Sequence, residues 1–464
     1  MQATAAPSGT DRRLTWLLVT VSCGGILAPL NSTMLAVALP SIRDAFDISH
    51  AALGWLVSSY LIAMAVGQPV GGRLGDSLGR ARVFRWALWA FVAASLGAAL
   101  APAFWPLVVL RIAQALAGAA VIPTGLAMLR QEVPAHRLGR IFGLNGAAMS
   151  CAAAAGPLIG AALLAAGSWR ALFLLNVPVV LIALVLGARF VAPDAPVATR
   201  RALDWIGAAL FTVILVGVTV LLEGLRGGTA SVLIAAGVVS LVALLLFARR
   251  LATVEAPTIE WRLFRERSFA AGTLHVLLTN LVMYTVLLMV PFFVNEVQRR
   301  GSTTSGLLLG AMSVLMTIIA PFAGRLSDAW GRRSLALAGS VVLFAGTLLL
   351  LLTISPDVSS SVIALALALI GIGIGIGVVA ASTAAIESAP VALAGSASGT
   401  NSMMRYLGSI VGVGVLASVL TTQGGAPPTI AAFRVIVAFI AVIALVCIPV
   451  AACLHRLPPE ISTP

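Results

Sequence analysis

Two arginines and one histidine interrupt long runs of apolar residues: Arg111, Arg405 and His275. A charged side chain inside a membrane is costly unless it is paired or hydrated, so both arginines are candidates to line a water-filled binding cavity. Histidine titrates near neutral pH, which makes His275 the candidate carrier of a coupled proton. The chemistry that these residues suggest is therefore binding and proton exchange rather than catalysis.

Several uncharged polar side chains fall at similar depths within the apolar runs. Amide and phenol groups donate and accept hydrogen bonds, so we expect them to contact a bound substrate together with Arg111 and Arg405. In lipid, such groups also join neighbouring helices, and this alternative stays open for each of them. The residues are Asn31, Gln114, Asn145, Asn280, Tyr284 and Asn401.

Acidic residues are absent from the middle of every apolar run. Four of them, Asp204, Glu223, Glu296 and Glu387, lie near the ends of runs, and the others lie in the gaps or tails. A cationic substrate would need a carboxylate in the cavity, because an unpaired cation is poorly stabilised away from water. We therefore expect a neutral to positive cavity and a small amphipathic substrate that is neutral or anionic. Glu223 and Glu387 are alternatives to His275 for proton exchange.

The sequence favours neither an enzyme nor a metal or cofactor site. The four cysteines lie in apolar runs without CxxC spacing, and neither an HExxH nor a GxSxG motif is present. Alternating glycines at residues 371–377 do not have the spacing of a nucleotide-binding loop, and they favour close helix packing instead.

The composition requires a lipid environment. Of the 464 residues, 60% are hydrophobic and only 10% are charged, whereas a soluble domain is nearer one half apolar and one quarter charged. A soluble enzyme, a nucleic-acid-binding protein and a disordered protein are thereby excluded. The net charge of +13 reflects membrane topology, since the basic residues lie in short gaps between the apolar runs.

Fourteen apolar runs follow one another, each near the length that a helix needs to cross a bilayer. Arginine-rich gaps alternate with arginine-poor gaps, and the positive-inside rule then places both termini in the cytoplasm. A bacterial inner membrane is the expected location.

One motif occurs twice with the same internal spacing, in gaps that lie on the same side of the membrane. Both copies are predicted to form tight cytoplasmic loops that latch the protein in one state: glycine permits the turn, and Asp76 is placed to accept hydrogen bonds from a helix N-terminus and to pair with Arg80. The motif residues are Gly72, Asp76, Gly79 and Arg80, repeated as Gly324, Asp328, Gly331 and Arg332.

The position of the repeat predicts an all-α integral membrane protein of two six-helix bundles with two inserted helices between them. We expect a cytoplasmic tail (1–13), an N-terminal bundle (14–190), inserted helices (206–248), a cytoplasmic linker (249–268), a C-terminal bundle (269–453) and a second cytoplasmic tail (454–464).

These motifs resemble the major facilitator superfamily, and in particular its fourteen-helix drug:proton antiporter group. Besides the repeated loop motif, the resemblance rests on the segment from Leu30 to Pro40, on Arg111 with Gln114 and Gly118, on the helix-5 antiporter motif Gly156, Pro157 and Gly160, on the run from Trp169 to Pro178, and on Asp204 with Gly207. It implies a major facilitator fold and secondary active export of a drug or metabolite by alternating access, usually driven by protons, without ATP.

The sequence departs from this group at Asn31, where the family pattern has an aspartate. Asparagine cannot titrate, so proton coupling at this position is lost. A lipid flippase, or a proton-independent facilitator or importer of an organic anion, remains an alternative on the same scaffold. The expected partners are a small-molecule substrate, membrane lipids and the proton as candidate coupling ion; we expect a monomer and no nucleic acid.

Overall fold

The computed structural model describes residues 9–133, 135–194, 204–224, 229–254, 261–390, 394–420 and 429–455. Within these ranges every regular element is helical. Thirteen spans are long and apolar enough to cross a membrane. The helix α4 (Arg80–Ala99) is the fourteenth; it packs against its neighbours α5 and α8, and three arginines near its start lower its hydropathy.

The N-terminal bundle contains six membrane crossings, the first and last of which are each built from two helices. Its elements are α1 (Gly9–Gly25), α2 (Leu27–Phe46), α3 (His50–Leu78), α4 (Arg80–Ala99), α5 (Phe104–Glu132), α6 (Ala135–Ala165), α7 (Ala171–Leu174) and α8 (Asn176–Phe190). The first predicted apolar run is thus interrupted at Ile26, between α1 and α2.

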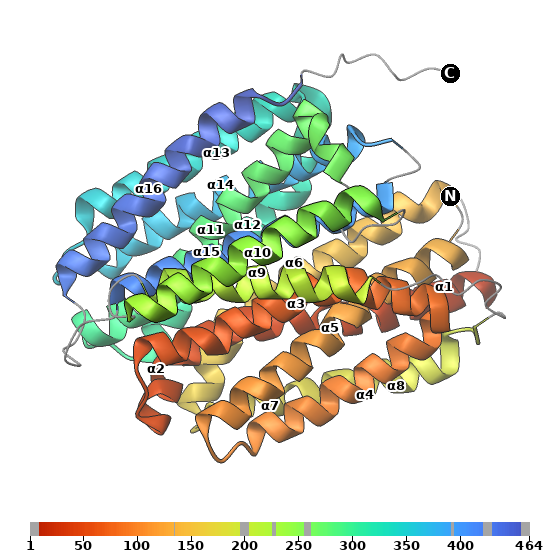
Figure 1. Ribbon diagram of the computed structural model, residues 1–464, viewed down its shortest axis with the longest axis horizontal. Coiled ribbons are helices and arrows are strands. Elements are labelled where there is room, and N and C mark those ends of the chain that lie inside the picture. Colours follow the sequence, from red (N-terminus) through yellow and green to blue (C-terminus); the bar gives the residue numbers. More distant parts are fainter. Residues whose placement is uncertain are drawn as a thin grey trace, which may run out of the picture.

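The C-terminal bundle has the same number of crossings, and a helical hairpin precedes it. The hairpin is α9 (Trp205–Gly224) and α10 (Ala230–Thr253). The bundle contains η1 (Trp261–Arg265), α11 (Arg267–Phe292), η2 (Phe293–Val297), α12 (Ser302–Trp330), α13 (Arg332–Thr353), α14 (Ser360–Glu387), α15 (Ala394–Leu420) and α16 (Ile430–Ala452). The two bundles lie side by side, and the start of α1 and the end of α16 lie toward the same end of the molecule (Figure 1).

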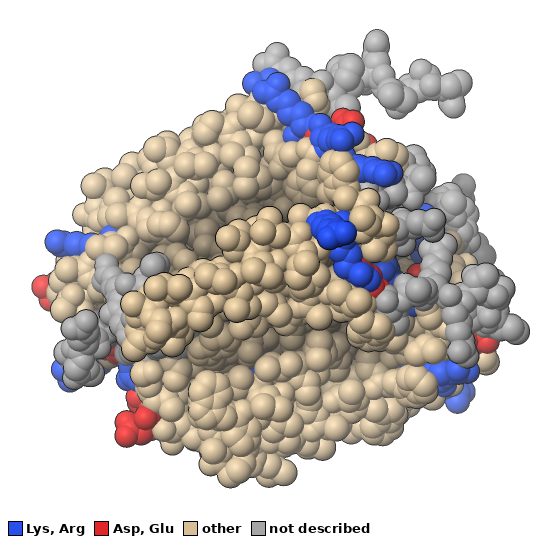
Figure 2. All heavy atoms as spheres, in the orientation of Figure 1, with Lys and Arg blue, Asp and Glu red and all other residues tan. Residues whose placement is uncertain are grey.

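Charged side chains gather at the two ends of the molecule. Figure 2 shows an uncharged surface along the helices between these ends. Large apolar side chains such as Trp89, Leu245 and Leu352 are more than half exposed, as expected for surfaces that face lipid rather than water. Hydroxyl groups of Ser49 and Ser359 cap the starts of α3 and α14 by accepting hydrogen bonds from backbone N–H groups.

The repeated motif does not form the loops that the sequence predicted. Helix α3 continues to Leu78 and α4 begins at Arg80, so Gly79 alone connects them, with φ of +101°. Gly331 connects α12 to α13 in the same way, with φ of +83°. A one-residue connection is possible because glycine adopts positive φ without steric cost.

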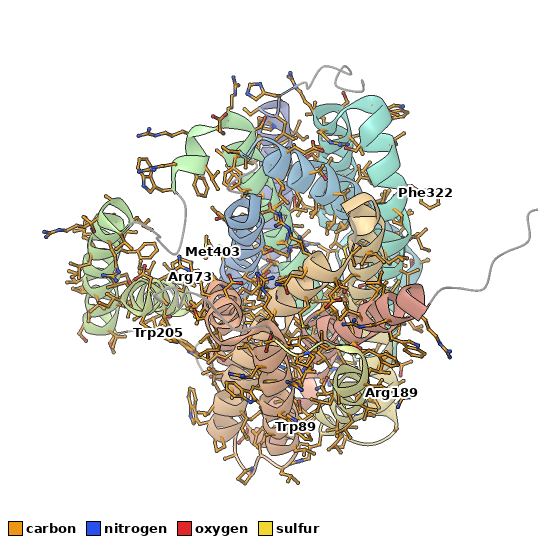
Figure 3. All side chains as sticks on the ribbon, turned by 90° about the vertical axis from the view of Figure 1, so that its right-hand side faces the viewer. Arg73, Trp89, Arg189, Trp205, Phe322 and Met403 are labelled. Atoms are coloured by element: carbon orange, nitrogen blue, oxygen red, sulfur yellow. The ribbon has the colours of Figure 1, made fainter. Side chains whose placement is uncertain are left out.

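The inserted hairpin is attached through one of its helices. Helix α9 packs on α3 of the N-terminal bundle and on α15 of the C-terminal bundle, whereas α10 packs mainly on α9. Figure 3 shows the hairpin at the edge of the molecule, with Trp205 at its near end. At this end, Asp204 accepts hydrogen bonds from the backbone N–H of Gly207 (2.9 Å) and from Arg250 Nε (2.5 Å). This capped ion pair ties the two helices of the hairpin together.

The alternating glycines of α14 provide two close helix contacts. A Cβ atom at Gly371 or Gly375 would collide with the backbone of α12, and a Cβ atom at Gly373 would lie 2.5 Å from the backbone nitrogen of Leu343 in α13. The absence of side chains therefore allows α14 to approach both neighbours, as expected for small residues at membrane helix contacts.

We predict that Gly373→Ala lowers thermal stability, because overpacking a tight contact typically costs about 1–3 kcal/mol. The apparent melting temperature of the detergent-purified protein should fall by several degrees. Gly399→Ala is the matched control, since a Cβ atom there meets no heavy atom within 4 Å. Equal melting temperatures for both variants would contradict the packing argument.

Candidate functional site

A cavity of about 410 Å³ lies between the two bundles. Its walls come from α2, α3, α5 and α6 on one side and from α11, α12, α14 and α15 on the other. Because both bundles contribute, a rocking motion of one bundle against the other would change access to this space.

The cavity extends toward the cytoplasmic end and is closed toward the outer end. On α14 its lining reaches Thr383, one turn before the end of the helix at Glu387. Toward the outer end, buried apolar side chains of α2, α3, α11 and α15 fill the space between the bundles. These residues, including Leu39, Val57, Leu288, Phe292 and Leu416, form what we call the outer plug. The space between the bundles is thus filled at this end and hollow toward the other.

The polar part of the cavity contains Arg405. This side chain is exposed and belongs to the cavity lining. Within the part of the chain that the structure describes, its guanidinium group has no hydrogen-bond or ion-pair partner. Two neutral hydrogen bonds nearby join the bundles: Ser32 to Tyr284 (2.7 Å) and Gln68 Nε2 to the hydroxyl of Tyr406 (3.3 Å). Arg405 therefore places an uncompensated positive charge in the cavity.

The apolar part of the cavity is rich in methionine. Met149 comes from the N-terminal bundle, while Met283, Met312 and Met316 come from the C-terminal bundle. Methionine is flexible and polarisable, and it adapts to apolar and aromatic groups of different shapes. Because methionines also serve as ordinary core residues, their sequence positions gave no signal for this role.

Three of the predicted substrate-contacting residues line the cavity: Asn280, Tyr284 and Arg405. The amide nitrogen of Asn280 donates to the carbonyl of Val276 on its own helix (2.8 Å). The amide oxygen of Asn280 takes no part in that bond. These residues come from α11 and α15, so the C-terminal bundle supplies all of the predicted contacts that the structure brings together.

Arg111, Asn31 and Gln114 lie inside the N-terminal bundle rather than in the cavity lining. Arg111 is 1% exposed and donates to Asn31 Oδ1 (3.0 Å) and Gln114 Oε1 (2.7 Å). Gln114 in turn donates to Ser95 Oγ (2.7 Å). The guanidinium also lies 4.0 Å from the ring centroid of Tyr60, which itself lines the cavity. The expectation that Arg111 faces the cavity is thus not met, because partners within its own bundle solvate the charge.

The remaining predicted polar residues lie outside the cavity lining. Asn145 accepts from Ser22 Oγ (3.1 Å), and Asn401 donates to Ser382 Oγ (3.2 Å). His275 is buried between α11 and α13, where Ser340 (2.9 Å) and Thr279 (3.3 Å) contact its two ring nitrogens. The structure gives His275 no direct contact with the cavity, so its proposed proton exchange lacks geometric support.

Each motif copy contains an arginine that forms an ion pair. Arg80 donates to Asp76 through Nε (3.1 Å) and NH2 (2.8 Å). Arg332 forms a two-point contact with Glu387 at the end of α14, at 3.1 and 2.9 Å. The side chain of Asp328 lies outside the described residues, whereas Gly72 and Gly324 lie on helices α3 and α12.

The cap of α4 comes from a residue that the sequence reading missed. Asp194, which follows α8, accepts hydrogen bonds from the backbone N–H groups of Ala81 (2.8 Å) and Arg82 (2.9 Å). The expectation that Asp76 caps this helix is therefore wrong, since Asp194 occupies the N-terminus of α4. A carboxylate at this position is favoured by the helix dipole.

The helix-5 motif serves close packing in this structure. A Cβ atom at Gly160 would lie 2.7 Å from the carbonyl oxygen of Met34, and one at Gly156 would collide with Thr33. Pro157 lies between them within α6. The motif thus lets α6 approach α2 beside the cavity. Among the described residues, no group of three or more His, Cys, Asp or Glu side chains is placed to hold a metal ion.

Comparison with known proteins identifies the class. Residues 21–413 match the Major Facilitator Superfamily, and the chain belongs to this family of membrane transporters, which are not enzymes. It is 34% identical over 398 residues to the uncharacterized MFS-type transporter YvkA of Bacillus subtilis (strain 168), covering 85% of this chain and 88% of the relative. The resemblance seen in the motifs is thereby confirmed.

Two further likenesses concern a drug-resistance protein and a solved structure. The chain is 31% identical over 410 residues to the multidrug resistance protein Stp of Mycobacterium tuberculosis (strain CDC 1551 / Oshkosh), covering 87% of this chain and 75% of Stp. The crystal structure of a D-xylose-proton symporter superposes with a TM-score of 0.71 at 14% identity, covering 96% and 99% of the two chains. At this identity the second likeness shows the fold alone.

We predict that Arg111→Met destabilises the N-terminal bundle. The substitution leaves the acceptors on Asn31 and Gln114 without their donor, and each unsatisfied buried group costs about 1–3 kcal/mol. The apparent melting temperature in detergent should fall well below that of the parent protein.

The matched control for Arg111 is Arg405→Met, which removes the same group from a position without a described partner. We expect its melting temperature to stay within a few degrees of the parent protein. If Arg405→Met proved the more destabilising of the two, our assignment of Arg111 as the structural arginine would be wrong.

Proposed function

We propose that this transporter moves a small amphipathic molecule, neutral or anionic, out of the bacterial cytoplasm by alternating access. The observation that carries the proposal is the charge of the cavity. Arg405 is the only formally charged residue among the described residues that line it. An anionic group would pair with this guanidinium, and the apolar walls around it would make the attraction stronger than in bulk water.

The separation of apolar and polar side chains in the cavity lining supports an amphipathic substrate. The methionines of α6, α11 and α12 offer an apolar surface, and Arg405 with Asn280 and Tyr284 offers a polar one. The similarity to Stp, a multidrug resistance protein, supports export and a tolerant cavity. We also propose that the protein acts as a monomer in the inner membrane.

The test is ligand-induced thermal stabilisation of the purified protein with three probes that share an aromatic body. The probes are 8-anilinonaphthalene-1-sulfonate (anionic), N-phenyl-1-naphthylamine (neutral) and (1-naphthylmethyl)trimethylammonium (cationic). A ligand at about 100 times its Kd raises the free energy of unfolding by about 2.7 kcal/mol. We expect the anion to raise the melting temperature most and the cation to have no effect.

The matched variants are Arg405→Gln and Arg189→Gln. Arg405→Gln should abolish stabilisation by the anion and retain that by the neutral probe, whereas the exposed Arg189 at the end of α8 is remote from the cavity lining and its variant should behave like the parent protein. Stabilisation by the cation, unchanged in Arg405→Gln, would refute the proposed charge selectivity. Direction is then measured as probe accumulation in inside-out vesicles, where an exporter concentrates the anion inside.

A further inference from the structure

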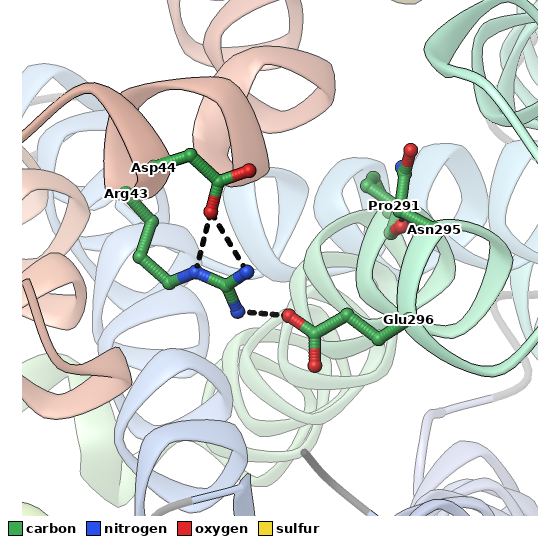
Figure 4. A network of polar contacts seen from close by, with 5 residues as sticks. All are labelled: Arg43, Asp44, Pro291, Asn295 and Glu296. Carbon is green, nitrogen blue, oxygen red and sulfur yellow. Dashed lines mark hydrogen bonds and ion pairs between the residues drawn. The ribbon is translucent and has the colours of Figure 1, made fainter. Parts of the chain in front are cut away.

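An ion pair joins the two bundles at the outer end of the molecule. Arg43 lies near the end of α2, and Glu296 lies in η2, directly after α11. Arg43 NH1 contacts Glu296 Oε1, while Arg43 Nε and NH2 contact Asp44 Oδ1 at 3.1 and 2.9 Å. Figure 4 shows the guanidinium between the two carboxylates, one from each bundle. Arg43 therefore connects an acid on its own helix with an acid on the opposite bundle.

The two carboxylates differ in exposure. The side chain of Glu296 is 9% exposed, whereas that of Asp44 is 67% exposed. Water and salt screen the exposed Arg43–Asp44 contact, so it contributes little. The Arg43–Glu296 contact is shielded, and loss of one charge from a shielded pair is strongly unfavourable for the arrangement that contains it. Of these two acids, Glu296 is the one that links the charge of Arg43 to the relative position of the bundles.

The ion pair lies at the outer end of the outer plug. Phe292 of the plug precedes η2 by one residue, and Leu39 lies one helical turn before Arg43. The deeper contacts between the bundles, Ser32–Tyr284 and Gln68–Tyr406, are neutral hydrogen bonds. Opening of the outer side must therefore separate Arg43 from Glu296.

We propose that Glu296 is a proton-binding site whose occupation from the outer medium favours the outward-open state. This inference rests on the proposed transport cycle. One proton converts the Glu296 carboxylate to a neutral acid, while Arg43 keeps its charge and its contact with Asp44. The attraction that holds the bundles together at the outer end is present when Glu296 is ionised and is lost when it is protonated, so acid opens the outer side.

The other charged groups around Glu296 do not replace it. Arg43 and Asp44 come from α2, and Asp47 follows that helix; Arg299 and Arg300 follow η2. The segments of α11 and α12 that adjoin η2 contain no charged residue. Asp357 lies between Pro356 and Val358, whose carbonyls accept from Gln298, and Arg434 follows Phe433, which contacts Phe293 of η2. Arg300 donates to Ser360 at the start of α14. Asp44 also contacts Arg43, and it serves as the control.

The position of Glu296 determines what its proton can do. The plug separates this carboxylate from the cavity, so the proton enters from the outer medium and returns to it. Glu296 therefore controls access in response to external pH, and does not carry protons across the membrane. This role is separate from substrate recognition at Arg405.

The experiment measures the distance between spin labels at Ala45→Cys and Thr303→Cys, which lie at exposed positions on opposite bundles. The native cysteines Cys23, Cys151, Cys447 and Cys453 are replaced by serine, and double electron–electron resonance is recorded at about pH 8 and about pH 3.5, which lie on either side of the ordinary glutamate pKa of about 4.3. In the protein that carries only these two labelled cysteines, one population has a longer distance between the labels. This long-distance population should grow at least about threefold at the lower pH.

Glu296→Gln should give the long-distance population at both pH values, and Arg43→Gln should do the same. Asp44→Asn removes the other partner of Arg43 and should keep the pH response. A pH response that persists in Glu296→Gln, or that disappears in Asp44→Asn, would overturn the assignment.

The charge-swapped variant Arg43→Glu/Glu296→Arg separates loss of the ion pair from loss of the fold. It should restore the closed population at neutral pH, because the attraction is re-formed with its partners exchanged. Persistence of the open population would show that the ion pair is not the cause. The measurement uses no substrate, so failure here leaves anion binding at Arg405 standing, and failure of anion binding leaves the pH response standing.

Discussion

The cost of placing a charge inside a membrane organises this protein. Arg111 and Arg405 lie within membrane-spanning helices of opposite bundles, and each must be solvated. Arg111 receives its solvation from the protein, through Asn31, Gln114 and the ring of Tyr60. Arg405 has no such partners among the described residues and faces the cavity instead. The N-terminal bundle thus buries the charge of Arg111, whereas the C-terminal bundle exposes the charge of Arg405 to the cavity.

Because of this difference, the N-terminal bundle contributes no charged side chain to the described lining of the cavity. The charge of Arg111 is held inside this bundle, away from the cavity. The bundle contributes mainly apolar and hydroxyl surface to the cavity through Ser32, Met149 and Tyr60. The C-terminal bundle contributes the charge, the amide of Asn280 and three of the four methionines. The charged, amide and sulfur groups of the cavity lining therefore come mainly from the C-terminal bundle.

The fold could be predicted from the sequence in most respects, whereas the site could be predicted only in part. Long apolar runs and a repeated motif are sufficient for fourteen crossings, because a helix is the simplest structure that satisfies its backbone in lipid. They do not fix the rotation of each helix. Arg111 and Arg405 were indistinguishable in sequence for this reason, since each residue turns the side-chain direction by about 100°. The contacts of Asp194 and Glu296 connect residues remote in sequence, and no local pattern announces them.

The inserted hairpin makes the two seams between the bundles unlike each other. Helix α9 contacts both α3 and α15 along one seam, and Leu222 of α9 approaches Gly414 of α15. The other seam is formed by α6 and α12. A helix that touches both moving bodies must slide on at least one of them, which small residues such as Gly414 permit in the manner of a shear contact. One seam is consequently covered by the inserted helix α9, whereas the other faces lipid. Changes in bilayer thickness or fluidity would then act on the transport cycle from one side of the molecule more than from the other.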